Sequence, residues 1–427
     1  MPEIRVPSAA RWDESTPVRV TGLDPERRVT LRATATAWFD DTGTSEATFE
    51  ATADGVVDTS EQAPLAGDYE GVAPTGWLWA LSETDGPAGG RPTGDGDDVT
   101  VRLELHDDGT ELATAETTRR RTAPGVDHES VAVERTVPAA DDGGESVTVG
   151  VIGELFSPPR SGPHRAVVCL HGSAGRPLRG VASLLAAHGY AAVAVQYVGD
   201  HESLPDTLAE VPVETVAAAA DWLRERSAVR GDAIGLFGRS KGAELAVESA
   251  ARFDWPVTTV AVAPSRHRWQ ALDGGEEPRS SWCAGGEPLP FVPFRARPGE
   301  TEDGAVVFRD TYVDSRERVP SDRLEAAAID AAAVDCPTLL VSGGDDMMWP
   351  AGEDAERLAA ALRDGGTPVT HDHYPDAGHG LGVPYAPPTT ATRAGEMALG
   401  GDPAANARAA AEHWRTVRDH LAETLGE

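Results

Sequence analysis

The residues with the clearest chemical potential form the pentapeptide Gly238-Arg239-Ser240-Lys241-Gly242, which has the pattern G-x-S-x-G. A short apolar run typical of a buried strand precedes it, and a run typical of a helix start follows it. A serine at a sharp turn between a strand and a helix is a nucleophile elbow, because the flanking glycines let the hydroxyl stand clear of the backbone. The pattern predicts Ser240 as a nucleophile and the backbone N–H of Lys241 as an oxyanion-hole donor.

A serine hydroxyl needs a base to activate it, and the base needs an orienting carboxylate. On a strand–elbow–helix scaffold the acid follows the serine along the chain, and the histidine follows the acid. Asp345 and Asp346 follow the apolar run 338–341 after Ser-Gly-Gly, and the carboxyl end of a strand lies at the catalytic edge of such a sheet. We predict Asp346 as the acid, with Asp345 as its alternative.

The predicted general base is His379, which lies in the Gly-bounded sequence Ala-Gly-His-Gly and follows Asp346 in the required order. A loop of this kind can bring an imidazole over a serine hydroxyl. His371 and His373 are weaker candidates, because they lie within or beside the preceding apolar strand.

A second oxyanion donor is expected after the first central strand, where the chain reads Leu-His-Gly-Ser-Ala-Gly over 170–175. We predict the backbone N–H of Ser173 as this donor and a structural role for His171. A nucleophile, a base, an acid and two fixed donors together predict acyl transfer through a covalent acyl-enzyme.

Lys241 is the only lysine among the 37 basic residues of the chain. Its backbone N–H serves the oxyanion hole whatever the side chain does. The ammonium has two possible places: beside Glu244, three residues further along the predicted helix, or near the reacting carbonyl group of the substrate.

Two patterns divide the 427 residues. Short runs separated by turn signals predict an all-β, immunoglobulin-like sandwich domain over 1–138, followed by a linker over 138–146. These runs are Val18–Val20, Val29–Thr36, Ala47–Ala53, Gly76–Leu81, Val99–Leu105 and Val131–Val137. A Gly/Asp/Pro-rich loop is expected over 85–98.

Strands and helices alternate over 139–427, which predicts an α/β-hydrolase domain with a mostly parallel sheet and helices on both faces. The predicted strands are 147–156, 166–170, 191–195, 257–262 and 338–341. Within this domain, residues 264–335 are either a lid over the site or an insertion with its own apolar cluster.

The formal net charge of −33 excludes a basic nucleic-acid-binding surface and is typical of proteins that work in molar salt. The chain has three cysteines without the spacing of metal ligands, so we expect no metal site and no disulfide framework. Without an apolar run of membrane-spanning length, and without a signal-like start, we expect a cytoplasmic protein that has no membrane contact.

Beyond these patterns, the chain resembles the family of acyl-CoA thioesterases and bile acid-CoA:amino acid N-acyltransferases from end to end. The resemblance is carried by the following segments, in order: Pro17–Val20 with Val29–Ala33, Gly76–Leu81, Gly238–Leu245, Asp345-Asp346 with Trp349, Tyr374–His379 with Pro384–Pro387, and Leu399–Pro403 with Trp414. It implies an N-terminal β-sandwich before the hydrolase domain and triad roles for Ser240, Asp346 and His379.

The resemblance further implies hydrolysis of an acyl-CoA to a free acid and CoA, within fatty-acyl metabolism and without a cofactor. The amino-acid-conjugating member of the family has cysteine as its nucleophile, so Ser240 favours water as the acceptor. N-acyl transfer to an amino acid, and carboxylester hydrolysis as in dienelactone hydrolases, remain alternatives. Candidate substrate-binding residues are Arg176 and Arg179 for coenzyme A, and Trp269 and Trp282 for the acyl chain.

Overall fold

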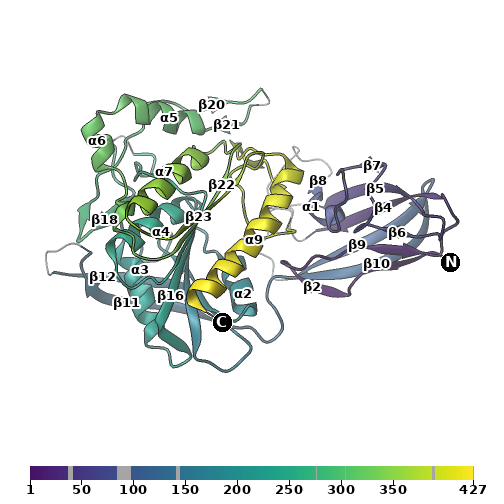
Figure 1. The fold of residues 1–427 in the computed structure, drawn as a ribbon, viewed down its shortest axis with the longest axis horizontal. Helices are drawn as coiled ribbons and strands as arrows, with labels where there is room; N and C mark the ends of the chain where they lie inside the picture. Colours follow the sequence, from purple (N-terminus) through teal and green to yellow (C-terminus); the bar gives the residue numbers. More distant parts are fainter. Residues whose placement is uncertain are drawn as a thin grey trace. The chain divides into compact units, whose positions relative to one another are not determined.

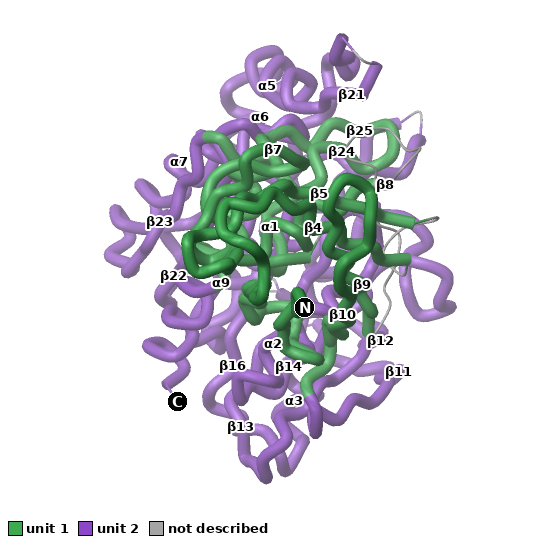
Figure 2. Tube along the Cα trace, turned by 90° about the vertical axis from the view of Figure 1, so that its right-hand side faces the viewer, with its two compact units in different colours: residues 1–123, 376–414 green, residues 124–375, 415–427 purple. Residues whose placement is uncertain are grey.

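The computed structural model describes residues 1–36, 42–83, 98–140, 145–275, 277–302, 304–386 and 390–426. They form two compact units, distinguished by colour in Figure 2. Unit 1 comprises residues 1–123 and 376–414, and unit 2 comprises residues 124–375 and 415–427. The first unit therefore ends earlier than the expected boundary at 138 and includes a segment from the C-terminal part of the chain.

Unit 1 is β-rich and contains two sheets of mainly antiparallel strands, as expected for a sandwich. The smaller sheet has the order β1-β3-β6, with bounds Glu3–Arg5, Arg19–Thr21 and Val57–Asp58. The larger has the order β2-β10-β9-β4-β5-β7, with bounds Ala9–Arg11, Thr110–Arg120, Asp98–Asp107, Arg28–Ala35, Gly43–Glu50 and Ala66–Gly67. A further strand, β8 (Ser82–Glu83), pairs with β5. Every second residue of β4 and of most of β9 is buried, so these strands present one face to the core.

Residues 76–81 were expected to form a strand, and this prediction is wrong: Gly76–Trp79 form the short helix α1. The backbone N–H groups of Leu78 and Trp79 donate to the carbonyl of Thr75 at 3.0 and 3.2 Å. All four helix residues are buried, and a short, wholly buried apolar run has no periodicity that separates strand from helix. The predicted loop over 85–98 lies, except for Asp98, outside the described residues.

The segment 376–414 is joined to the rest of unit 1 by long-range hydrogen bonds. Thr390 Oγ1 donates to the carbonyl of Trp79 at 2.9 Å, and Trp414 Nε1 donates to Asp13 Oδ2 at 3.1 Å. This segment contains the hairpin β24 (Arg393–Ala394) and β25 (Met397–Ala398) and the first half of α9 (Pro403–Leu425).

Unit 2 contains an eight-stranded sheet of order β11-β12-β14-β13-β16-β17-β22-β23. The bounds are Asp127–Pro138, Ser146–Ser157, Ala191–Gln196, His164–Leu170, Val229–Arg239, Thr259–Val262, Thr338–Gly343 and Val369–Tyr374. Of these strands, Figure 1 labels β11, β12, β16, β22 and β23. Only the pairings of β12 are antiparallel. In sequence order the strands lie 1-2-4-3-5-6-7-8, which is the arrangement of an α/β hydrolase, and the five predicted strands are confirmed.

The apolar run at 131–137 belongs to this sheet, because β11 pairs with β12 along its whole length. Its expected place among the N-terminal strands is therefore wrong. The expected linker instead joins two paired strands, and its residues 141–144 lie outside the described part. Alternating burial with many exposed positions fits a sandwich strand and an antiparallel edge strand equally well.

Adjacent residues of a strand point to opposite faces of its sheet. Because consecutive residues of the central strands in unit 2 are buried, both faces of this sheet are covered, and helices cover them. On one face α3 (Glu214–Arg224), α4 (Lys241–Arg252) and α7 (Ala351–Asp364) share an apolar core with Val168, Leu236 and Leu340. The other carries α2 (Arg179–Ala187) and the end of α9, where Thr258 Oγ1 and His420 Nε2 are 2.7 Å apart. No helix among the described residues has the length and apolar character needed to cross a membrane.

Residues 264–335 interrupt the sheet between β17 and β22 with short elements. They are β18 (Trp282–Ala284), β19 (Glu287–Pro288), β20 (Gly299–Glu300), β21 (Val306–Val307), α5 (Arg309–Arg318), α6 (Ser321–Ala326) and the 3₁₀ turn Ala331–Ala333. Strand β18 also pairs with β15 (Val211–Pro212). The segment has an aromatic cluster in which Tyr312 contacts Trp269, Phe294 and Trp349 edge to face. This cluster is compatible with an insertion that has its own apolar contacts, and the alternative role of 264–335 as a lid stays a prediction.

Candidate active site

Ser240 stands between the end of β16 and the start of α4, with φ +57° and ψ −124°. A positive φ is strained for a residue with a side chain and persists only where the surrounding structure fixes it. Here the backbone N–H of Ser240 donates to the carbonyl of Val262 in β17 at 2.8 Å, and its carbonyl accepts from Ala243 N at 2.8 Å. The half-buried serine therefore has the backbone conformation of a nucleophile elbow.

The two glycines of the pentapeptide are required for steric reasons. A Cβ at Gly238 would lie 2.1 Å from the carbonyl oxygen of Gly242. A Cβ at Gly242 would lie 2.2 Å from the carbonyl oxygen of Leu170 and 2.4 Å from that of His171. These are backbone atoms at the end of β13, so α4 can begin this close to β13 only if position 242 lacks a side chain.

We expect Gly242→Ala to lower the free energy of unfolding by at least about 2 kcal/mol, because the added methyl group overlaps backbone that cannot rotate away. The better helix propensity of alanine offsets only about 1 kcal/mol of this cost. Thermal unfolding checks the prediction, with Gly299→Ala as control, because no atom lies within 4 Å of a Cβ at Gly299. Equal melting temperatures for the two variants would contradict it.

The loop after β13 lies directly against the serine. A Cβ at Gly172 would lie 3.2 Å from Ser240 Cβ and 3.6 Å from its Oγ. The exposed Ser173 follows. This loop therefore lies beside the hydroxyl of Ser240.

His171 is a fixed part of that loop. Its ring stacks on Tyr197 with centroids 3.8 Å apart, and its carbonyl accepts a hydrogen bond from Tyr197 Oη. Burial lowers the pKa of His171 to about 4, so the imidazole is neutral at pH 7. Sequence patterns did not identify Tyr197, which follows the end of β14 without any motif.

The Lys241 side chain lies beside Glu244, with Nζ 2.8 Å from both carboxylate oxygens. This geometry selects the first of the two placements that the sequence left open. Both side chains are buried.

The two candidate acids differ sharply in environment, since Asp346 is fully buried and Asp345 is exposed. Asp346 Oδ1 accepts hydrogen bonds from the backbone N–H groups of Met348 and Trp349 at 2.8 and 3.1 Å. These bonds fix the carboxylate in a turn three residues after β22. Ser240 and Asp346 thus lie beyond the carboxyl ends of β16 and β22, which both flank β17.

His379 belongs to unit 1 and lies in a turn after β23. Its backbone N–H donates to the carbonyl of Leu399 at 2.9 Å, and the preceding Gly378 N–H donates to Asn406 Oδ1 at 2.9 Å. A Cβ at Gly378 would lie 2.2 Å from the carbonyl oxygen of Gly400, so the close approach requires glycine. The imidazole is half-buried in a turn whose backbone is held at several points.

The other two histidines of this region have a different environment. His371 Nε2 and His373 Nδ1 lie 2.8 and 3.0 Å from Ser342 Oγ, a buried hydroxyl inside β22. They therefore bracket a serine that lies within a strand and not at an elbow.

The four predicted substrate-binding residues fall into two groups. Arg176 is exposed in the segment after β13, whereas Arg179 Nε pairs with Glu154 Oε2 at 2.9 Å. Trp269 and Trp282 are 1% and 0% exposed, and both indole N–H groups have buried hydrogen-bond acceptors. Neither tryptophan presents a surface to solvent.

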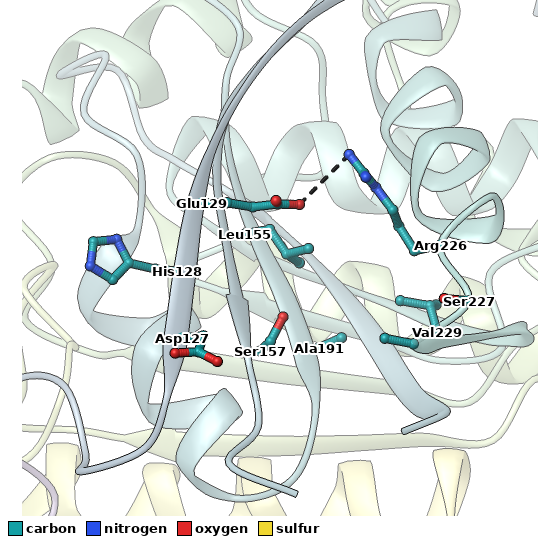
Figure 3. A pocket seen from close by; sticks show the side chains of 10 residues that line it. Asp127, His128, Glu129, Leu155, Ser157, Ala191, Arg226, Ser227 and Val229 are labelled. Atoms are coloured by element: carbon teal, nitrogen blue, oxygen red, sulfur yellow. Dashed lines mark ion pairs between the residues drawn. The ribbon is translucent and has the colours of Figure 1, made fainter. Parts of the chain in front are cut away.

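A pocket of about 400 Å³ lies at the edge of the sheet opposite to the one that carries Ser240 and Asp346 (Figure 3). It is lined by the starts of β11, β14 and β16, at Asp127, Ala191 and Val229 respectively, and therefore by the amino ends of these strands. The ion pair between Glu129 and Arg226, 3.6 Å apart, spans part of it. The pocket is separate from Ser240, which follows the carboxyl end of β16.

Two protein-family models match the chain. The C-terminal model of the BAAT/acyl-CoA thioester hydrolases matches residues 211–427, and the N-terminal model of the same proteins matches residues 13–133. Among solved structures, an esterase of Pyrococcus furiosus is 13% identical, covers 70% of this chain and 92% of its own, and has a TM-score of 0.40.

Two curated relatives represent the two activities of these proteins. Mitochondrial acyl-coenzyme A thioesterase 2 of Rattus norvegicus is 30% identical over 98% of this chain and 88% of its own length. Acyl-coenzyme A amino acid N-acyltransferase 1 of Mus musculus is 28% identical over 99% of this chain and 98% of its own length. The predicted resemblance is confirmed: the chain belongs to the BAAT/acyl-CoA thioester hydrolase family.

Proposed function

We propose that this protein is an acyl-CoA thioesterase that works through a Ser240–His379–Asp346 triad. Ser240 Oγ attacks the thioester carbonyl while His379 takes the hydroxyl proton. The tetrahedral intermediate collapses, the C–S bond breaks, and His379 returns the proton to the CoA sulfur. Water, deprotonated by His379, then cleaves the acyl-serine ester and releases the free acid. The reaction needs no metal or cofactor.

The observation that carries this proposal is the strained Ser240 backbone with the Gly172 loop beside its hydroxyl. The N–H groups of Lys241 and Ser173 would stabilise the oxyanion, and two such donors contribute several kcal/mol to lowering the barrier. Asp346 is the acid because its carboxylate is buried and fixed.

Chain connectivity supports His379 as the base. Gly344 N–H donates to the carbonyl of Tyr374 at 2.9 Å, and a Cβ at Gly344 would lie 2.8 Å from Pro375 Cα. The chain therefore leaves β23 beside the turn that holds Asp346. His379 follows Pro375 by four residues, which span at most about 14 Å of chain.

Arg176, exposed four residues after Gly172, is the candidate cation for the polyanionic coenzyme A. On a chain with net charge −33, a phosphate-bearing substrate needs local positive charge or screening by salt. We expect Arg176→Ala to raise KM for an acyl-CoA by about three- to tenfold, with little change for an uncharged acyl-N-acetylcysteamine thioester. Arg179→Ala is the matched control, because Glu154 already pairs with that guanidinium. Equal changes for both substrates would contradict a role for Arg176 in CoA binding.

N-acyl transfer is the second candidate function, favoured by the relative that is an acyl-coenzyme A amino acid N-acyltransferase. A serine nucleophile favours hydrolysis over conjugation, because the resemblance implies a cysteine nucleophile in the conjugating member of the family. Carboxylester hydrolysis is the third candidate, because simple esters use the same serine chemistry.

The deciding experiment measures release of CoA thiol from short- to long-chain acyl-CoAs in molar KCl, with and without glycine. Release that is independent of glycine, together with free fatty acid as product, is the expected result. Release that requires glycine and yields an N-acyl glycine would establish the transferase. No release from folded protein that hydrolyses p-nitrophenyl esters would overturn the CoA proposal in favour of a carboxylesterase.

A further inference from the structure

We propose that the Lys241 ammonium is a positioning group for the oxyanion hole: a buried network built on it holds the first turn of α4 against the Ser173 loop. This inference rests on the proposed function, because it concerns the same two donors. It adds a role for the side chain of a residue whose backbone alone was assigned above.

The network starts with a fully enclosed ion pair. Lys241 is 1% exposed and Glu244 is 0% exposed. The ammonium lies 2.8 Å from both carboxylate oxygens and 5.1 Å from the centroid of the Trp282 ring. A cation at this distance from an indole is attracted to the ring face. Burial lowers the pKa of Lys241 and raises that of Glu244, while each charge opposes the shift of the other.

Glu244 then ties the ion pair to the segment that follows β17. Its Oε1 accepts from Trp282 Nε1 at 2.6 Å and from the backbone N–H of Trp269 at 3.2 Å. With the two contacts from Lys241, both carboxylate oxygens are satisfied. The first turn of α4, which includes the N–H of Lys241, is therefore fixed from a direction that backbone hydrogen bonds do not provide.

An aromatic path continues from Trp282 to the oxyanion loop. The Trp282 and Tyr197 rings meet edge to face with centroids 5.9 Å apart, and Tyr197 stacks on His171. Tyr197 Oη donates to the carbonyl of His171, two residues before Ser173. The same carbonyl lies 2.4 Å from a Cβ at Gly242. One network thus contacts both segments whose N–H groups form the proposed oxyanion hole.

This arrangement is poorly explained by stability alone. A buried ion pair gains little over apolar residues of the same volume, because both charges lose their hydration. Arginine is the usual base in this chain, yet a planar guanidinium is larger than an ammonium. It would enter a space closed by the Trp282 ring and by Glu244. The geometry therefore fits a compact cation that fixes catalytic backbone.

The test uses a double variant that replaces both charged side chains by neutral ones. It includes a measurement, labelling of Ser240, that does not depend on acyl-CoA. Lys241→Met with Glu244→Gln leaves no unpaired buried charge, and the amide oxygen introduced at position 244 can still accept from the Trp282 indole and the Trp269 backbone. We would measure kcat and KM for the preferred acyl-CoA, the melting temperature, and the rate at which an uncharged fluorophosphonate labels Ser240. The phosphonyl oxygen uses the same two donors as the thioester oxyanion.

We expect the double variant to keep a near-native melting temperature while kcat and the labelling rate both fall by about 10- to 100-fold. KM should change by less than about threefold. The single variant Lys241→Arg should also have a kcat and a labelling rate below those of wild type, because the guanidinium does not replace the compact ammonium. Trp282→Phe provides a second route if the double variant is unfolded, because it removes the indole N–H; its kcat and labelling rate should fall by about threefold or more.

Glu248→Gln is the matched control on the same helix. Glu248 is also buried, and it pairs with Arg268 at 2.8 Å one turn further from Ser240. It should lower stability but leave kcat unchanged. Wild-type kcat and labelling rates in the folded double variant would overturn the inference, and so would an equal loss of rate in Glu248→Gln. A wild-type protein that is labelled but releases no CoA would overturn the proposed function, and the labelling rates would still decide this inference.

Discussion

Ser240→Ala is expected to lower kcat for acyl-CoA hydrolysis by about 10⁵-fold and to abolish fluorophosphonate labelling. The variant removes the atom that forms the acyl-enzyme, while the proposed oxyanion donors and substrate contacts remain and account for the residual rate. Removing one hydroxyl leaves the elbow backbone bonds intact, so the melting temperature should stay near that of wild type. CoA thiol release and mass spectrometry of the acylated peptide measure the effect.

Ser342→Ala is the control for this result. Ser342 is a serine of unit 2 whose Oγ has two imidazole nitrogens nearby, at 2.8 and 3.0 Å, but it lies within β22 and is fully buried. Its loss should leave kcat within about threefold of wild type. Folded Ser240→Ala protein with wild-type activity, or inactive Ser342→Ala protein of normal stability, would contradict Ser240 as the nucleophile.

The central strands could be predicted because their burial leaves a direct signature in the sequence. Parallel strands covered on both faces are continuous apolar runs, such as 166–170 and 338–341, and small or polar residues (His-Gly and Ser-Gly-Gly) follow them at the carboxyl edge of the sheet. The sheet to which β11 belongs could not be predicted. The alternating pattern of residues in β11 specifies one buried face but not the partner strand.

Long-range contacts set the other limit on prediction from sequence. The segment 376–414 joins unit 1 through single hydrogen bonds such as that between Trp414 and Asp13, which no local pattern reveals. In the same way, Trp282 was expected in an acyl-binding wall because it is aromatic and lies in a Pro/Gly-rich stretch. Its structural partner, Glu244, is 38 residues earlier in the chain. The elbow was predictable because its chemistry is encoded in five consecutive residues.

Asp346→Asn is expected to cause the second large loss of kcat, and this variant distinguishes the catalytic role of Asp346 from that of the adjacent Asp345. Asparagine keeps a carbonyl oxygen for the N–H groups of Met348 and Trp349, so the turn persists. It removes the negative charge that would orient and stabilise the protonated base in the proposed triad. We expect kcat to fall by about 10⁴-fold, as for the loss of the carboxylate from an aligned triad.

Asp345→Asn is the matched substitution, one residue away on an exposed side chain. An exposed charge in water affects a nearby site by only about 1 kcal/mol, so kcat should stay within about fivefold of wild type. Stopped-flow acylation by an acyl-CoA, with melting temperatures of both variants, measures the difference at the chemical step. A large loss in Asp345→Asn with normal rates in Asp346→Asn would exchange their roles. Equal small effects would show that the catalytic base needs no carboxylate from this turn.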